Sequence, residues 1–215
     1  MVWTLAPQGS KAYPLISRLG ATAKLRDRKQ AALLIVPAAY IPPSFPCPAL
    51  APDGLCAIHA DKPARCRTMP FYPYRNEEDQ ADLLVPRKGW DCDTSTDAPV
   101  VYRDKKIVDR ADFDRERGEL LEQAPLMRTY AEYMLKYQHW IIDSLAKAGP
   151  GGNVVTSLSS FLTAAKLPDA AALATRQQPV LADYAARTAG EHKLGEYARN
   201  YAGWAKEMEY LARRG

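Results

Sequence analysis

All four cysteines of this 215-residue chain lie in one proline-dense segment, which extends from Val36 to Pro99. Proline fixes its own φ and lacks the backbone N–H that helices and central strands need, so this segment cannot form a regular helical core. The turn signal at Pro52–Gly54 adds to the irregular path of the chain. We expect only short strands in and beside the segment, over Ala32–Val36, over Asp82–Pro86 and around Cys56–His59.

The pattern changes after Asp109, where proline becomes sparse and apolar residues recur at helical spacing. We predict a domain boundary near residue 110, with a Cys/Pro-rich metal-binding module over 1–110 and a helical domain over 111–215. The fold class is mainly α, with a small irregular, Cys/Pro-rich α+β metal-binding module and a C-terminal helical bundle. The predicted helices span Asp112–Gln123, Pro125 to the turn at 149–153, Thr156 or Ser157 to Lys166, Asp169–Thr188 with an interruption at Pro179, and a last helix carrying Leu194 to Leu211.

Aromatic residues form stripes on two of these predicted helices. The stripe is clearest on the last helix, where Tyr197, Tyr201, Trp204 and Met208 repeat at steps of three and four. Such a stripe can line a cofactor pocket, but helix–helix packing produces the same pattern far more often. We interpret both stripes as packing surfaces and assign them no chemistry.

Charge and hydropathy exclude several classes of protein. The 29 basic and 25 acidic residues are spread along the whole chain, so we expect no nucleic-acid partner. The longest apolar run, Ala31–Val36, is far shorter than the roughly 20 residues that span a bilayer, and the first residues lack the pattern of a secretory signal. We therefore expect a cytoplasmic protein with no membrane partner. Because cytosolic thiols are kept reduced, four clustered cysteines indicate metal binding rather than disulfides.

The spacing C-x8-C-x9-C-x25-C predicts one ligand set made of Cys47, Cys56, Cys66 and Cys92. Four thiolates match the ligand count of a tetrathiolate zinc site and also that of a 4Fe–4S cluster. The spacing itself does not distinguish the two. The alternative is that these residues are buried thiols that pack as small hydrophobic side chains.

Three neighbouring residues extend the candidate site. His59 is an alternative ligand, because nitrogen replaces a thiolate at some zinc and iron–sulfur centres. Arg65 and Arg67 flank Cys66, where they could offset the negative charge of thiolates or donate backbone N–H groups to sulfur. The opposing interpretation is that both are ordinary exposed arginines.

From Cys47 the chain reads CPALAPDGLCAIHADKPARCRTMPFYPYR. This stretch resembles the YkgJ-type family of zinc- or iron-chelating proteins, also described as Fe–S-cluster-containing or CxxCxxCC proteins. The resemblance covers about residues 30 to 95 and implies a metal site built from cysteines. The residues that carry it are Cys47, Leu50, Gly54, Cys56, Ile58, His59, Lys62, Pro63, Cys66, Arg67, Pro70 and Phe71, followed by Trp90, Asp91 and Cys92.

The N-terminus departs from that family. Its members carry a cysteine cluster there, commonly followed by an apolar–Thr–Leu segment and a helix that contains Leu-Gly. This chain starts with Met1-Val2-Trp3-Thr4-Leu5 and reaches Leu19-Gly20 with no cysteine before Cys47. We expect that the sequence starts just downstream of a missing cluster, through truncation, an incorrectly assigned start or real loss. The four thiols would then be the whole site or the surviving part of a larger one.

Three functions are compatible with these features. The first is a metal-binding protein that holds an iron–sulfur cluster, or zinc, and acts in redox chemistry, in metal handling or as an accessory factor. The second is a protein-modifying enzyme similar to flagellin lysine N-methylases, which carry a similar cysteine-rich stretch. The third is an interaction module in which zinc is structural and the helical domain recruits a protein partner. No catalytic triad, P-loop or H-E-x-x-H motif is recognisable, which leaves enzyme activity undecided.

Overall fold

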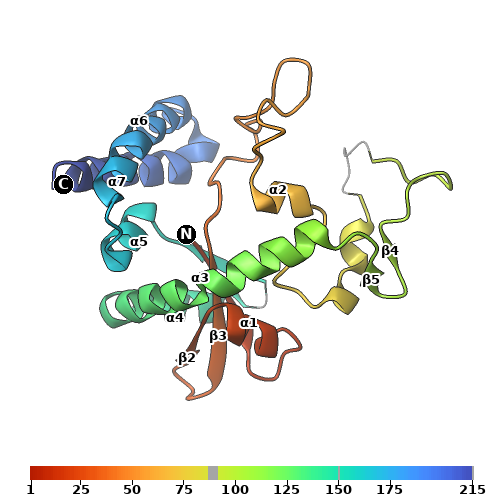
Figure 1. Cartoon of the computed structure of the whole chain (residues 1–215). Helices are drawn as coiled ribbons and strands as arrows, with labels where there is room; N and C mark the ends of the chain where they lie inside the picture. Colours follow the sequence, from red (N-terminus) through yellow and green to blue (C-terminus); the bar gives the residue numbers. More distant parts are fainter. Residues whose placement is uncertain (87–91, 150, 215) are drawn as a thin grey trace. The chain divides into compact units, whose positions relative to one another are not determined.

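The computed structural model describes residues 1–86, 92–149 and 151–214, which are mainly helical with some strand (Figure 1). The described residues form seven α-helices, several short 3-10 turns and two small sheets, so the predicted class, mainly α with some β, is confirmed. The strand order of the larger sheet is β2 (Ala21–Lys24), β3 (Gln30–Val36), β1 (Val2–Pro7) and β6 (Asn153–Val155). The chain divides into two compact units: unit 1 comprises Met1–Leu5, Ile35–Pro48 and Leu126–Gly215, and unit 2 comprises Ala6–Leu34 and Ala49–Pro125. The domain boundary predicted near residue 110 falls inside unit 2.

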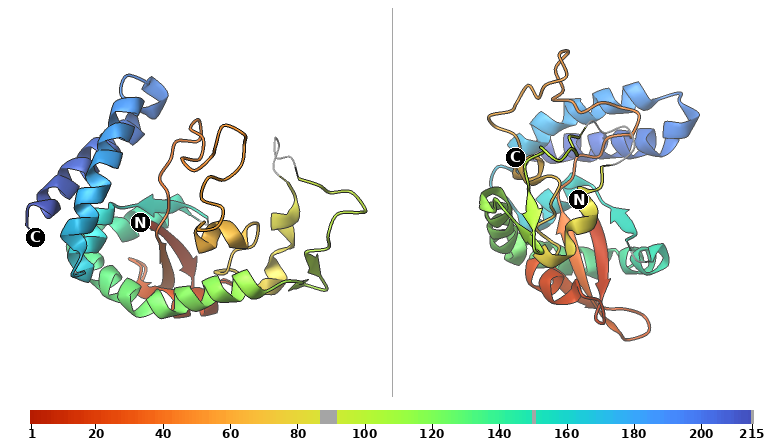
Figure 2. Two further views of the ribbon diagram at one scale, coloured as in Figure 1. Left: turned by 45° about the horizontal axis from the view of Figure 1, so that its top comes forward. Right: turned by 90° about the vertical axis from the view of Figure 1, so that its right-hand side faces the viewer.

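Unit 1 holds most of the helical residues. Helices α6 and α7 run side by side (Figure 2). Helix α5 (Leu158–Ala165) joins them through a hydrophobic cluster of Leu162, Ala174 and Met208. The elements are the start of β1 (Val2–Pro7), the second part of α3 (Ala111–Tyr137), α4 (Trp140–Ala148), β6 (Asn153–Val155), α5 (Leu158–Ala165), α6 (Ala170–Thr188), η3 (His192–Leu194) and α7 (Gly195–Ala212).

A buried polar network ties the first strand of unit 1 to its helices. β1 pairs antiparallel with β6, with Trp3 opposite Val154. The fully buried Trp3 donates from Nε1 to Thr156 Oγ1 at 2.9 Å. The Tyr130 hydroxyl bonds the same Oγ1 at 2.9 Å and Ser160 Oγ at 2.7 Å. Because these buried polar atoms bond one another, the network avoids the cost of unpaired polar groups.

Two prolines lie inside continuous helices, so the predicted break at Pro125 and the predicted interruption at Pro179 are both wrong. Both prolines are exposed. In α3 the buried face, which includes Ala124 and Met127, continues on both sides of Pro125. Proline in a helix interior costs about 3 kcal/mol, and burial of such an apolar face offsets this cost. The expected second helix is instead divided between α3 and α4.

Unit 2 contains a β-hairpin, short helices and the first part of α3. β2 pairs antiparallel with β3, with Ala21 opposite Leu33, and the strand predicted over Ala32–Val36 is confirmed as part of β3. A separate cluster of Phe71, Ile107 and Phe113 forms a small core. The remaining elements are α1 (Tyr13–Leu19), β2 (Ala21–Lys24), β3 (Gln30–Val36), α2 (Ala64–Thr68), η1 (Glu77–Asp79), η2 (Ala81–Leu84), β4 (Tyr102–Arg103) and β5 (Lys106–Ile107).

The other two expected strands are absent from the described residues. Residues 81–84 form the 3-10 turn η2, so the strand predicted over Asp82–Pro86 is wrong. Around Cys56–His59 the chain makes only an isolated bridge between Leu50 and Cys56. Both segments fold back locally, and only the one before Cys56, with Pro52–Gly54, carries a turn signal in its sequence.

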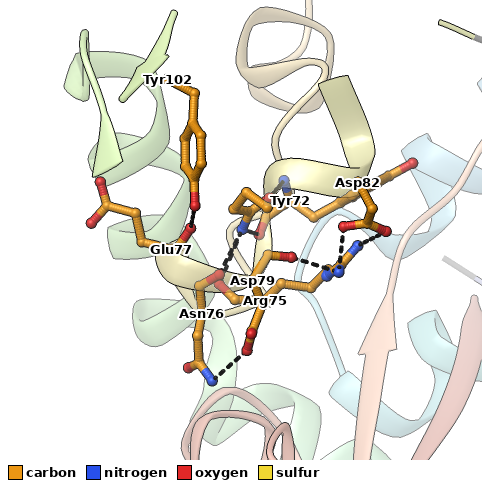
Figure 3. A network of polar contacts seen from close by, with 8 residues as sticks. Tyr72, Arg75, Asn76, Glu77, Asp79, Asp82 and Tyr102 are labelled. Atoms are coloured by element: carbon orange, nitrogen blue, oxygen red, sulfur yellow. Dashed lines mark hydrogen bonds and ion pairs between the residues drawn. The ribbon is translucent and has the colours of Figure 1, made fainter. Parts of the chain in front are cut away.

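A buried amide explains the fold of residues 72–84. The Gln80 side chain is fully buried; its Oε1 accepts from the Tyr72 N–H at 3.0 Å and its Nε2 donates to the Tyr72 carbonyl at 2.8 Å. Beside it, Arg75 donates to Asp82 Oδ1 at 2.8 Å and to the Asp79 carbonyl at 2.6 Å (Figure 3). The Arg75 guanidinium lowers the pKa of the Asp82 carboxyl. These bonds fold residues 72–84 back on themselves, and an extended strand could not form them. We call residues 72–84 the clasp.

Candidate functional site

The four cysteines are free thiols, and all four are exposed. Cys47 belongs to unit 1, whereas Cys56, Cys66 and Cys92 belong to unit 2. None of them packs in a hydrophobic core, which contradicts the alternative that they are buried small hydrophobic residues. Exposed, reduced thiols are available as metal ligands and also open to oxidation.

Cys56 follows a tight turn whose bonds explain the local sequence. The Ala51 N–H donates to the Leu55 carbonyl at 2.8 Å, and the Ala57 N–H donates to the Ala49 carbonyl at 2.8 Å. Gly54 has a φ of +82°, a conformation that residues with a Cβ rarely adopt. Asp53 Oδ1 accepts from the Leu55 N–H at 2.9 Å. The turn signal at Pro52–Gly54 therefore indicated the structure correctly, and the Gly-x-Cys step places Cys56 on its far side.

His59 lies in the next turn, where its N–H donates to the Cys56 carbonyl at 3.1 Å. Its imidazole is exposed. The alternative ligand and Cys56 are thus close in the chain and linked by their backbones. Ligation by His59 stays a prediction.

Cys66 lies on α2, and the arginine before it anchors this short helix. The Arg65 guanidinium donates to the Phe71 carbonyl, forms an ion pair with Glu116 Oε1 at 3.4 Å and stacks 4.7 Å from the centroid of the Tyr72 ring. The Glu116 side chain is nearly buried, and its Oε2 has no hydrogen-bond partner in the described part of the chain. Arg65 therefore links α2 to α3.

The arginine after Cys66 holds the preceding loop. Arg67 donates from Nε to the Lys62 carbonyl at 3.2 Å and from Nη2 to the Ala60 carbonyl. Thr68, which is buried, donates to the Ala64 carbonyl at 3.0 Å. Cys66 is thus an exposed thiol on a helix that is fixed on both sides. Whether either arginine also compensates thiolate charge stays a prediction.

Cys92 lies in an irregular stretch. Just after it, Asp93 Oδ1 accepts from the Ser95 N–H at 2.9 Å, and this bond lowers the pKa of the Asp93 carboxyl. Trp90 and Asp91, which complete the Trp-x-Cys part of the family resemblance, lie outside the described residues.

The donor chemistry of the predicted site suits zinc and iron–sulfur clusters, because thiolates are the preferred ligands of both. Within residues 1–86, 92–149 and 151–214, however, no group of three or more His, Cys, Asp or Glu side chains is arranged to hold a metal ion. The thiols are therefore suitable in type and number, while Cys56, Cys66 and Cys92 of unit 2 do not form such a group.

Comparison with known proteins adds no relative: no family model matches the chain, and no curated protein or solved structure matches it either. A search of the described helices found none that is long and apolar enough to cross a membrane.

Proposed function

We propose that the protein binds a metal through Cys47, Cys56, Cys66 and Cys92, holding an iron–sulfur cluster in preference to zinc. The observation that supports this most directly is that all four cysteines are free, exposed thiols within one irregular, proline-rich segment. The residues between and around them, which resemble the YkgJ-type family, add a second line of support. The role that follows is in redox chemistry, in metal handling or as an accessory factor.

Metal binding of this kind includes a folding step. A site that is not preassembled forms when its ligands converge on the metal, and the binding free energy then contributes directly to the stability of the segment. Cys66 is the natural fixed point because Arg65 and Arg67 anchor its helix. We expect the turn that carries Cys56 and the stretch that carries Cys92 to reorganise around it.

The chemistry of the ligands also supports a reducing compartment. Exposed thiols in an oxidising compartment are prone to disulfide formation, whereas cytosolic thiols are kept reduced. We therefore propose a cytoplasmic location, which agrees with the free state of all four cysteines.

The test is metal analysis of protein purified without oxygen. Iron and sulfide in stoichiometric amounts, with a broad visible absorption band, support the cluster. Stoichiometric zinc without colour supports the alternative in which zinc is structural and the helical domain recruits a protein partner. Protein that binds neither metal, even after reconstitution with iron and sulfide or with zinc, overturns the proposal.

Single substitutions identify the ligands. Cys66→Ser and Cys56→Ser should each lower the metal content and the stability of the metal-loaded protein together. His59→Ala should leave the metal content unchanged if all four ligands are thiolates, and lower it if the imidazole is a ligand. Ser44→Ala, an exposed substitution in the same proline-rich segment, is the matched control. Equal metal content in the two cysteine variants and the control would contradict the assignment.

A further inference from the structure

Unit 1 contains a cavity of about 350 Å³ that no cysteine lines. Its residues come from residues 1–2, from the segment 38–48, from β6 and the start of α5, and from α6 and α7. The volume lies within the range of roughly 300–1,000 Å³ that is typical of small-molecule sites. Thr156, Tyr201 and Met208 are buried at its base, while Val180 is 46% exposed. The cavity is therefore open to solvent on one side and closed by packed side chains on the other.

Its aromatic wall is held in place by specific bonds. Tyr201 donates from its hydroxyl to the Tyr40 carbonyl, and the Asn200 amide donates to the Tyr40 hydroxyl at 3.0 Å. The Tyr40 ring lies edge-on to Trp204, with 5.0 Å between centroids, and stacks on Tyr197 at 4.7 Å. Rings fixed in this way form a preorganised surface, so a ligand would not have to order them on binding.

A second set of contacts involves Tyr184, which lines the cavity. The Arg187 guanidinium lies 4.9 Å from the centroid of the Tyr184 ring and 4.8 Å from that of Phe45. Arg187 thus joins α6 to the segment 38–48 on the outside of the cavity and does not line it.

The residues that line the cavity determine which kind of small molecule it can bind. Within the described part of the chain, no Asp, Glu, Lys, Arg or His side chain lines the cavity. Met1 does line it; its amino group donates to the Thr156 carbonyl at 2.7 Å, and burial lowers the pKa of this group to about 6, so that it is largely uncharged at neutral pH. A charged ligand would lose its hydration there without gaining an opposite charge, which is costly. Aromatic rings favour a planar, polarisable partner that can stack or meet them edge-on. The half-buried Gln177 amide, which offers both a donor and an acceptor, supplies a polar group to orient it.

We propose that this cavity binds an uncharged, planar aromatic small molecule that carries one hydrogen-bonding group, which the Gln177 amide meets. The aromatic stripe of α7 then has two tasks, since Tyr201, Trp204 and Met208 both pack the bundle and line the site. The proposal does not depend on the metal: Pro48, which lines the cavity, is the neighbour of Cys47, but none of the four cysteines lines it.

Binding is tested by isothermal titration calorimetry on the full chain with two probes that share one ring system. 2-Naphthol is uncharged at neutral pH, whereas naphthalene-2-sulfonate carries a full negative charge. At neutral pH, 2-naphthol should bind with a stoichiometry of one and at least about tenfold more tightly than the sulfonate, since no basic side chain lines the cavity and the Met1 amino group, with its pKa lowered to about 6, is largely uncharged. Absence of saturable 2-naphthol binding, or equal affinity for both probes, overturns the proposal.

Three variants, one of them a control, locate the binding. Val180→Phe adds bulk at the exposed rim of the cavity and should weaken 2-naphthol binding at least about tenfold, whereas Ala182→Phe adds a ring to an exposed position of α6 outside the lining and should leave it unchanged. Gln177→Leu should reduce the preference for 2-naphthol over naphthalene by about threefold to tenfold, the loss expected for one hydrogen bond. Binding that is the same in Val180→Phe and Ala182→Phe, or a preference unaltered in Gln177→Leu, would place the probe elsewhere and refute the proposal.

Discussion

A substitution of Gln80 tests whether the hydrogen bonds of its buried side chain stabilise the clasp, residues 72–84. Its side chain accepts one hydrogen bond, from the Tyr72 N–H, and shares its two amide protons among the carbonyls of Tyr72, Arg75 and Asn76 at 2.8, 3.3 and 3.2 Å. These contacts amount to three hydrogen bonds at about 1 kcal/mol each. Alanine also leaves a small cavity that costs a further ~1 kcal/mol. Gln80→Ala should therefore lower the free energy of unfolding by about 4 kcal/mol.

The assay is urea unfolding followed by circular dichroism. Gln8→Ala is the matched control, because Gln8 is exposed and belongs to the same unit. The control should stay within about 0.5 kcal/mol of the parent protein. A loss of less than about 1 kcal/mol for Gln80→Ala would refute the idea that the buried amide determines the clasp.

Gln80→Glu should make the stability of the protein depend on pH in a predictable direction. The new carboxyl keeps an acceptor for the Tyr72 N–H, but its second oxygen faces backbone carbonyls, so burial and repulsion raise its pKa above the unfolded value. A raised folded-state pKa gives stability that is complete below the unfolded pKa, about 4.3, and is lost as the pH rises through the folded pKa. Relative to the parent protein, Gln80→Glu should lose stability between acidic and neutral pH, while Gln80→Ala should show a constant difference. A Gln80→Glu curve parallel to that of the parent protein would contradict this reasoning.

Three further predictions concern the other buried polar groups. Tyr130→Phe should destabilise the protein by about 1–2 kcal/mol in urea unfolding, because it removes two buried hydrogen bonds, whereas Tyr133→Phe, on the exposed side of α3, should have no measurable effect. Arg65→Ala should cost about 2–3 kcal/mol by leaving Glu116 without its cation, and the added change Glu116→Gln should recover part of this loss in the same assay. Burial raises the pKa of Tyr74 to about 12. The stability that this residue contributes should therefore disappear as the pH rises from about 10 to about 12. Tyr74→Phe should remove this part of the loss of stability at alkaline pH, which urea unfolding at each pH measures.

Sequence patterns predicted those elements whose signal is local. The N-cap at Ser157, whose Oγ accepts from the Ser160 N–H, and the regular stripe of the last helix both appear at the expected places. The expected breaks at Pro125 and Pro179 failed because the local cost of proline is smaller than the gain from burying the face that continues beyond it. The turn over Ala81–Leu84 was missed because it depends on a buried glutamine, and a polar residue gives no periodic signal.

For the candidate sites too, the sequence predicted which types of residue are present but not how they are arranged in space. The sequence could supply the types of metal ligand, since four cysteines in a proline-rich segment are visible without a structure. It could not show that Arg65 pairs with Glu116, because these two residues lie far apart in the chain. For the aromatic stripe of α7, the periodicity correctly placed Tyr201 and Met208 in a packed interface. Periodicity shows only which side of a helix is apolar, so it could not reveal the cavity. A cavity arises where packing is incomplete, and here that depends on the path of the segment 38–48, whose prolines and turns have no period at all. Aromatic stripes that face a proline-rich segment, rather than another regular helix, are therefore the ones in which a binding site should be sought.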